Sequence, residues 1–129
     1  FFHPGLRETV AARLDGLFDG GAASGCYGSV DGPRFNSKAE IRALRAAGAA
    51  FVSQTCGPEA VLANEHELPY ALAGFGVDFA NGVTAEPTPV EVLQANLEAG
   101  GALFRQLIPA LVKEALPAFS FANFIYRFD

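Results

Sequence analysis

The sequence contains no methionine, and it opens on Phe1 and Phe2. A translated protein starts with methionine, and that residue is normally trimmed only when a small side chain follows it, which phenylalanine is not. We therefore expect that this chain does not begin where its gene begins. It would then be a proteolytic product, one half of a nicked polypeptide, a segment with a separate partner, or a chain whose first residues are missing.

Basic residues and cysteines are also scarce. The nine Lys and Arg residues are scattered and the net charge is −5, which argues against nucleic acid as a partner. Cys26 and Cys56 have no CxxC motif and no histidine at ligand spacing, so we expect reduced thiols and no metal site. No apolar run approaches the roughly 18 residues of a membrane span, and the first residues lack the basic-then-apolar profile of a signal peptide. The composition predicts a cytoplasmic domain with no membrane partner.

The chain has 129 residues, half of them hydrophobic, which is enough for one domain with a core. Helical periodicity alternates with short apolar runs, and this alternation predicts an α/β fold with a mostly parallel or mixed sheet. We expect strands over 25–31, 49–54 and 69–77. We expect helices over 5–18, 37–48, 58–63 and 88–115.

Two capping boxes mark helix starts, one from Ser37 to Glu40 and one from Thr88 to Glu91. Pro109 should kink the last helix, because its ring displaces the carbonyl of Arg105. The tail over 118–129 is too aromatic for a solvated end, so we expect it to dock on another surface. Its aromatic residues are Phe119, Phe121, Phe124, Tyr126 and Phe128.

Two positions have the local pattern of a functional site. Thr55 lies at a strand-to-helix turn, where backbone amides and the helix dipole favour an anion, although a plain N-cap is the alternative. Asp78 follows the predicted buried strand 69–77, and α/β proteins place their sites at the carboxyl ends of such strands. The alternative role for Asp78 is a carboxylate that caps the following loop.

Three segments together resemble the trimeric purine nucleoside phosphorylases, which include the methylthioadenosine phosphorylases. They are GPRFNSKAE over 32–40, TCGPEAVLA over 55–63 and the predicted strand ending at Asp78, in the family's order and spacing. The resemblance covers nearly the whole chain, weakens after Pro87, and corresponds to about the second half of a family member.

This resemblance implies that residues 1–129 are the C-terminal half of a single domain. The implied fold is half of a three-layer α/β phosphorylase/hydrolase-like fold, with a central mixed β-sheet flanked by helices. The absent N-terminal half would carry the glycine-rich phosphate loop, an Arg and a His on phosphate, and the remaining strands. The complete protomer is then expected to form a homotrimer.

The implied activity is phosphorolysis of a purine nucleoside or its 5′-methylthio analogue, with inorganic phosphate as co-substrate and no cofactor. The enzyme must place phosphate beneath the sugar, hold the ribose, and stabilise the negative charge that arrives on the purine. Asp78 matches the catalytic position that contacts N7 of the purine. A protonated carboxyl would donate to N7 and a carboxylate would accept from it, and we favour a shared proton.

The resemblance assigns two more contacts to substrates, and the residue that follows Phe35 offers a third. Thr55 matches a hydroxyl on phosphate, and Phe35 matches the aromatic that packs on the purine, although a core Phe is the alternative. Asn36 would read the Watson–Crick edge of the base, or would merely lead into the capping box.

Two positions depart from the family's pattern. Gln54 stands where a Met usually lies under the ribose, so its amide would bond a sugar hydroxyl or perturb the site. Adenine-type members have Asp-x-Asp, whereas Ala80 removes the second carboxylate near the base. The identities of the base and of the sugar therefore stay open.

These departures also keep two other functions open. Gln54, Ala80 and the missing phosphate residues are compatible with a noncatalytic nucleoside-binding or assembly subunit. A nucleoside hydrolase on the same scaffold is the third possibility, and it would release base without phosphate.

Overall fold

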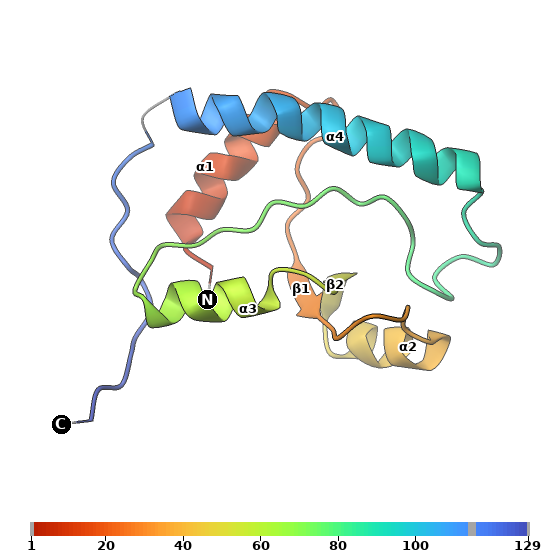
Figure 1. Cartoon of the computed structure of the whole chain (residues 1–129), viewed down its shortest axis with the longest axis horizontal. Helices are drawn as coiled ribbons and strands as arrows, with labels where there is room; N and C mark the ends of the chain where they lie inside the picture. The colour runs from red at the N-terminus through yellow and green to blue at the C-terminus, as the bar shows by residue number, and fades with distance from the viewer. Residues whose placement is uncertain (1, 114–115, 129) are drawn as a thin grey trace. The chain divides into compact units, whose positions relative to one another are not determined.

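The computed structural model describes residues 2–113 and 116–128. Within them it has mixed α/β architecture in the order α1 (Pro4–Asp15), β1 (Cys26–Ser29), α2 (Lys38–Ala46), β2 (Ala49–Ser53), α3 (Gly57–Glu65) and α4 (Val90–Lys113) (Figure 1). The helices and strands lie close to the predicted ranges, apart from the strand over 69–77, and the helix expected over 5–18 ends at Asp15. Residues 114–115, the end of the last predicted helix, lie outside the described residues. The described residues form two compact units, and α4 contributes residues to both.

The first unit comprises the described residues of Phe1–Ala22, Cys56–Gly74 and Leu103–Asp129. Its buried side chains are Ala60, Leu103 and Leu107. The aromatic tail is partly packed, because the ring of Phe119 lies 5.1 Å from that of His3. Further along, Asn123 donates to the side chain of Asn64 over 2.9 Å. The tail ends in exposed aromatics, namely Phe124, Tyr126 and Phe128.

The second unit comprises Ala23–Thr55 and Phe75–Ala102. Strands β1 and β2 pair in parallel, with Ser29 opposite Ser53, and α2 makes the crossover between them. The capping box at the start of α2 is confirmed: Glu40 N–H donates to the Ser37 hydroxyl, and Ser37 N–H donates to the Glu40 carboxylate. Ile41 is buried on this helix.

The predicted strand over 69–77 is wrong. The segment has no strand partner among the described residues, and β1 and β2 pair only with each other there. Its apolar composition suits a buried strand, but a β-strand also needs a neighbour to satisfy its backbone groups. Gly74 and Gly76 have no heavy atom within 4 Å of the position where a Cβ would stand.

The second predicted capping box is also wrong. Helix α4 begins at Val90, and the Thr88 hydroxyl donates to the carboxylate of Asp78 instead of serving the helix. Pro89 lies just before the first turn, where its missing N–H costs nothing, and its carbonyl accepts from Val92 and Leu93. The helix continues across Pro109 to Lys113.

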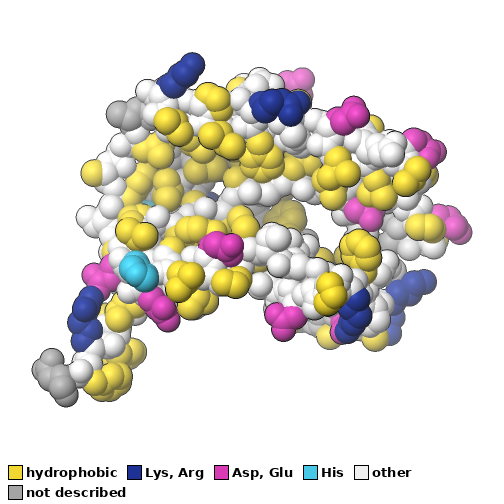
Figure 2. Space-filling view, viewed as in Figure 1, with side chains coloured by type: hydrophobic (Ala, Val, Ile, Leu, Met, Phe, Trp, Pro, Cys, Tyr) yellow, Lys and Arg dark blue, Asp and Glu magenta, His cyan; other side chains and the backbone are white. Residues whose placement is uncertain are grey.

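Much of the apolar side-chain surface is exposed. Figure 2 shows hydrophobic side chains at the surface along α4, on the face that it draws. Val90, Leu97 and Ile108 of this helix are all more than half exposed. A chain that is half apolar normally buries more of this surface than the described residues do.

Candidate functional site

The predicted site residues all belong to the second unit. Phe35 and Asn36 lie in the connection from β1 to α2, and Gln54 and Thr55 directly follow β2. Because β1 and β2 run parallel, both of these segments follow the carboxyl-terminal ends of the strands, at the same end of the sheet. Asp78 and Ala80 lie in the second chain segment of this unit, Phe75–Ala102.

The backbone that carries Phe35 is held at three consecutive carbonyls. Gln54 Nε2 donates to the carbonyl of Arg34 over 2.7 Å, and Asn81 Nδ2 donates to that of Asn36 over 2.8 Å. The carbonyl between them, that of Phe35, accepts from Arg34 Nη1 over 3.0 Å. The Phe35 side chain itself is 87% exposed. Phe35 is therefore not a core residue of this unit but a ring presented on a fixed backbone.

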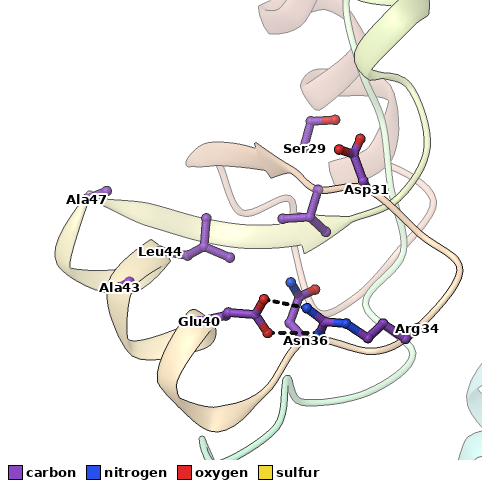
Figure 3. Close-up of a pocket in the computed structure, with 9 residues that line it drawn as sticks. Ser29, Asp31, Arg34, Asn36, Glu40, Ala43, Leu44 and Ala47 are labelled. Atoms are coloured by element: carbon purple, nitrogen blue, oxygen red, sulfur yellow. Dashed lines mark hydrogen bonds and ion pairs between the residues drawn. The ribbon is translucent and has the colours of Figure 1, made fainter.

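Arg34 connects this segment to the start of α2. Its guanidinium donates two parallel hydrogen bonds to the Glu40 carboxylate, at 2.9 and 2.7 Å (Figure 3). The hydrogen bond from Arg34, and then those from Ser37, lower the pKa of Glu40 to about 2. The ion pair also raises the pKa of Arg34. Glu40 thus supports both the helix start and the segment that precedes it.

The Arg34–Glu40 pair lies at one side of a surface groove of about 610 Å³. Asn36 also lines the groove, beside residues of β1 and α2 such as Ser29 and Leu44 (Figure 3). Asn36 is half-buried, and its amide side chain lies beside the Arg34–Glu40 ion pair (Figure 3). Of the predicted site residues, only Asn36 lines this groove.

The loop after Asp78 packs directly on the start of α2. Besides the hydrogen bond from Asn81 to Asn36, Gly82 approaches Lys38 so closely that an added Cβ would lie 2.9 Å from its Cγ. Gly82 also has a φ of 83°, which favours glycine. The hydrogen bond from Asn81 joins the loop of Asp78 to the loop of Phe35 across 45 residues of sequence, and Gly82 packs on the first residue of α2.

The segment leading to Asp78 is fastened to α4. Phe75 packs on Gly100, where an added Cβ would lie 3.0 Å from the phenyl ring. Asn96 Nδ2 then donates to the carbonyl of Val77 over 2.9 Å. The position of Asp78 is thus set by a helix, even though the segment itself is not a strand.

The two oxygens of Asp78 differ in their surroundings. Oδ1 accepts from the backbone N–H of Phe79 over 2.7 Å and from the hydroxyl of Thr88. Within 2–113 and 116–128, no hydrogen bond or ion pair to Oδ2 is formed. One oxygen therefore plays the loop-capping role considered as the alternative, while the other makes no such bond among the described residues.

Thr55 lies beside a second hydroxyl. Its Oγ1 is 3.2 Å from Oγ of Ser53, and its backbone carbonyl accepts from the phenol of Tyr27. The N-cap of α3 is Cys56, with φ of 66° and no capping side chain. The alternative role for Thr55, a plain N-cap, is therefore wrong.

Among the described residues, no group of three or more His, Cys, Asp or Glu side chains is arranged to hold a metal ion. The helices in the same part of the chain include none that is long and apolar enough to cross a membrane.

Comparison with protein families gives a match over most of the chain. Residues 4–113 match the model of the phosphorylase superfamily. The chain belongs to this superfamily.

Its relatives within the superfamily are named as nucleoside phosphorylases. The chain is 39% identical over 116 residues to a probable S-methyl-5′-thioinosine phosphorylase of Xanthomonas campestris, covering 87% of this chain and 45% of that protein. It is 37% identical over 94 residues to the 6-oxopurine nucleoside phosphorylase of Pyrococcus furiosus, with 70% and 36% covered. It is 43% identical over 82 residues to the S-methyl-5′-thioadenosine phosphorylase of Mycobacterium tuberculosis, with 64% and 29% covered. The chain therefore spans less than half the length of these relatives.

Three residues that hold the candidate site residues in place are not predicted from the sequence. The sequence pattern around Thr88 predicts a helix cap, and it predicts no site role for Asn81 or Tyr27. The available signal was chemical: each is a hydrogen-bond donor in or near a loop that also holds a predicted site residue. Their partners lie 10 to 45 residues away in sequence, so spacing alone does not identify them.

Proposed function

We propose that this chain, assembled with an N-terminal half, catalyses phosphorolysis of a purine nucleoside or 5′-methylthio purine nucleoside. The products are the free base and the corresponding ribose 1-phosphate. The observation that carries the proposal is the link between two loops: Asn81 ties the segment of Phe35 to that of Asp78. An exposed aromatic ring and a carboxylate with one open oxygen are thereby held on neighbouring loops.

The chemistry follows from these groups. The Phe35 ring would pack on the purine, and a flat ring on a flat base provides contact area without a defined hydrogen-bond pattern. As the bond from C1′ to N9 breaks, its electron pair moves into the purine. Asp78 would then stabilise N7 through a shared proton, which is general acid–base catalysis at the leaving group. Asn36, at the edge of the groove, would meet the polar edge of the base.

Phosphate would be bound partly by Thr55. The carboxyl ends of β1 and β2 meet there, and hydroxyls of Ser53 and Thr55 lie 3.2 Å apart. Ligands of α/β sheets commonly bind outside such strand ends. Gln54 would act mainly by holding the Arg34 carbonyl. Its amide oxygen, the group that would bond a sugar hydroxyl, lies against Gly32. We infer no cofactor, since phosphate itself is the attacking group.

Ala80 favours 6-oxopurines over 6-aminopurines. It is half-buried and carries no acceptor for an exocyclic amino group. The relatives named for 6-oxopurine nucleosides and for methylthioinosine agree with this direction. Another relative is named for methylthioadenosine, so the product assay below includes both adenine and hypoxanthine nucleosides, each with and without the 5′-methylthio group.

We also propose that residues 1–129 are the C-terminal half of one three-layer α/β domain in a cytoplasmic homotrimer. Two observations support a missing half: the chain spans less than half of its relatives, and its two-stranded parallel sheet leaves both edges without a described partner. Parallel sheets normally have more strands and helices on both faces. The exposed tail aromatics Phe124, Tyr126 and Phe128 would bury surface against the N-terminal half or a neighbouring protomer.

The test is a product assay on the assembled protein. Inosine, adenosine, methylthioinosine and methylthioadenosine are each incubated with and without phosphate, and free base is measured by chromatography. We expect phosphate-dependent release of base from at least one of them. Release without phosphate would show a hydrolase, and calorimetric binding without release would show a noncatalytic subunit.

A further inference from the structure

Thr88 approaches the proposed catalytic carboxylate from outside the segments that the family resemblance identified. Its side chain is half-buried, and its hydroxyl donates to Oδ1 of Asp78. The same oxygen accepts from the N–H of Phe79 over 2.7 Å. Two donors on one oxygen make Oδ1 the fixed end of the carboxylate. Oδ2, which has no hydrogen-bond partner within the described ranges, is the end that remains for a ligand.

The donor and the acceptor are both attached to the same helix. Thr88 immediately precedes Pro89, whose carbonyl accepts from Val92 and Leu93 in the first turn of α4. The acceptor side is held further along α4, where Asn96 donates to the carbonyl of Val77, the residue before Asp78. The span between these two attachments is a helix, which is far stiffer than a loop. The contact between Thr88 and Asp78 is therefore built into the fold of the second unit.

We propose that Thr88 is a positioning residue that holds Oδ1 of Asp78 and thereby directs Oδ2 to N7 of the purine. This inference rests on the proposed phosphorolysis and deepens it. Without the hydroxyl, only the adjacent N–H of Phe79 would hold the carboxylate, and rotation about the Cβ–Cγ bond would exchange the two oxygens. Misplacing a catalytic group costs turnover even where substrate binding is unchanged.

Proton transfer to N7 is the step that depends on the position of Oδ2. A phosphate oxygen bonds to C1′ while the C1′–N9 bond breaks, and the electron pair of that bond passes to the purine. The proton shared with Oδ2 is transferred to N7 as charge arrives there. Hydrogen phosphate loses its proton in becoming the sugar phosphate dianion, and through solvent that proton restores the shared one at Asp78.

The test compares two substrates on Thr88 variants of the assembled protein. Thr88→Val keeps the shape of the side chain and loses the donor, whereas Thr88→Ser keeps the donor. Inosine needs a proton at N7 for the base to leave, but 7-methylinosine already carries a methyl group and a positive charge there. Its departure is independent of proton transfer from Oδ2. Thr84→Val is the matched control, because Thr84 lies in the same loop and donates to the carbonyl of Glu86 over 2.8 Å.

For Thr88→Val we expect kcat on inosine to fall about tenfold, with KM changed by less than about twofold, as for a lost hydrogen bond to a charged group. Thr88→Ser should recover most of this loss, and Thr84→Val should behave as wild type. Turnover of 7-methylinosine should be nearly unchanged in every variant. Melting curves check folding, and Thr88→Ala replaces Thr88→Val if the valine variant does not fold.

Two results would overturn the positioning role while leaving phosphorolysis intact. One is an unchanged kcat on inosine in Thr88→Val, and the other is an equal loss on both substrates, which indicates general structural damage. A wild-type protein that releases no base in the presence of phosphate would overturn the proposed function itself, and this inference with it.

Discussion

Gln54 Nε2 donates to the backbone carbonyl of Arg34 over 2.7 Å, across 20 residues of sequence. The bond joins the end of β2 to the segment that presents Phe35. A methionine at this position, as in the family that the sequence resembles, has no N–H and makes no such bond. The departure at Gln54 therefore has a structural use in this chain: it fixes the loop on which the base would pack.

Replacing Gln54 tests that use directly. In Gln54→Met the Arg34 carbonyl loses its donor, and we expect KM for the nucleoside to rise about three- to tenfold, as for one lost hydrogen bond of about 1 kcal/mol. The value of kcat should change less than KM, because the loop acts on binding. Gln94→Met, an exposed glutamine on α4, is the control. A lower KM in Gln54→Met would show that the sugar contact matters more than the loop.

Substitutions at Phe35 should change the affinity for purine without changing the folding stability. Because the side chain is 87% exposed, Phe35→Ala should leave the melting temperature of this unit nearly unchanged. The affinity for purine should nevertheless fall by about tenfold, which is in the range measured for aromatic stacking pairs. Phe35→Tyr keeps the ring and should bind as wild type. Calorimetry with the free base checks both variants, and a large loss of melting temperature in Phe35→Ala would show a core role instead.

Ala80 is the position at which base preference should respond. Ala80→Asp restores a carboxylate that accepts from a 6-amino group, and we expect the ratio of kcat/KM for adenosine over inosine to rise about tenfold. The measurement is the initial rate of base release from each nucleoside at equal phosphate. Ala80→Asn offers both a donor and an acceptor and should shift the ratio less. No change in the ratio would place the 6-position of the base away from this residue.

The lowered pKa of Glu40 implies that folding stability depends on pH. Its pKa is lowered from 4.5 to about 2 by Arg34 and Ser37, so the ionised carboxylate is favoured in the folded state. Since the folded pKa is the lower one, this contribution is complete above about pH 4.5 and is lost as the pH falls toward 2. Glu40→Gln should therefore unfold at lower urea than wild type at neutral pH, and the difference should disappear near pH 2.

The control for this pH experiment is Glu91→Gln. Glu91 also lies in the first turn of a helix, but it takes no part in a capping box there. Its substitution should produce a smaller difference at neutral pH. A difference between Glu40→Gln and wild type that persists unchanged to pH 2 would contradict the role of the ionised carboxylate.

Local sequence patterns predicted the parts of this fold that contiguous residues determine. The Ser37–Glu40 capping box needs only four neighbouring residues, and both strands of the β1–α2–β2 unit are short apolar runs that begin at or directly after a glycine. The strand predicted over 69–77 was wrong because composition alone suggested it, while strand formation depends on a neighbouring strand elsewhere in the chain. The capping box predicted at Thr88 was wrong for a similar reason, because the Thr88 hydroxyl donates to a carboxylate that is distant in sequence.

The candidate site shows the same division. The resemblance identifies both Asp78 and Phe35, and position at a predicted strand end also points to Asp78. In the structure the Phe35 ring is exposed, and only one carboxylate oxygen of Asp78 is hydrogen-bonded among the described residues. What holds them in place was not predictable, because Gln54, Asn81 and Thr88 act through single hydrogen bonds to partners far away in sequence. Such bonds depend on tertiary structure, which local propensity does not contain.

The most direct test of the central claim is the rate of phosphate-dependent base release by Asp78→Ala in the assembled protein. If Oδ2 of Asp78 stabilises N7, kcat should fall by about 10²- to 10³-fold, in the range for a lost general acid. Nucleoside binding should fall far less. Asp78→Asn, whose amide still donates to N7, should retain part of the activity on inosine. A kcat for Asp78→Ala within about threefold of wild type would contradict the assignment of Asp78 as the general acid at N7.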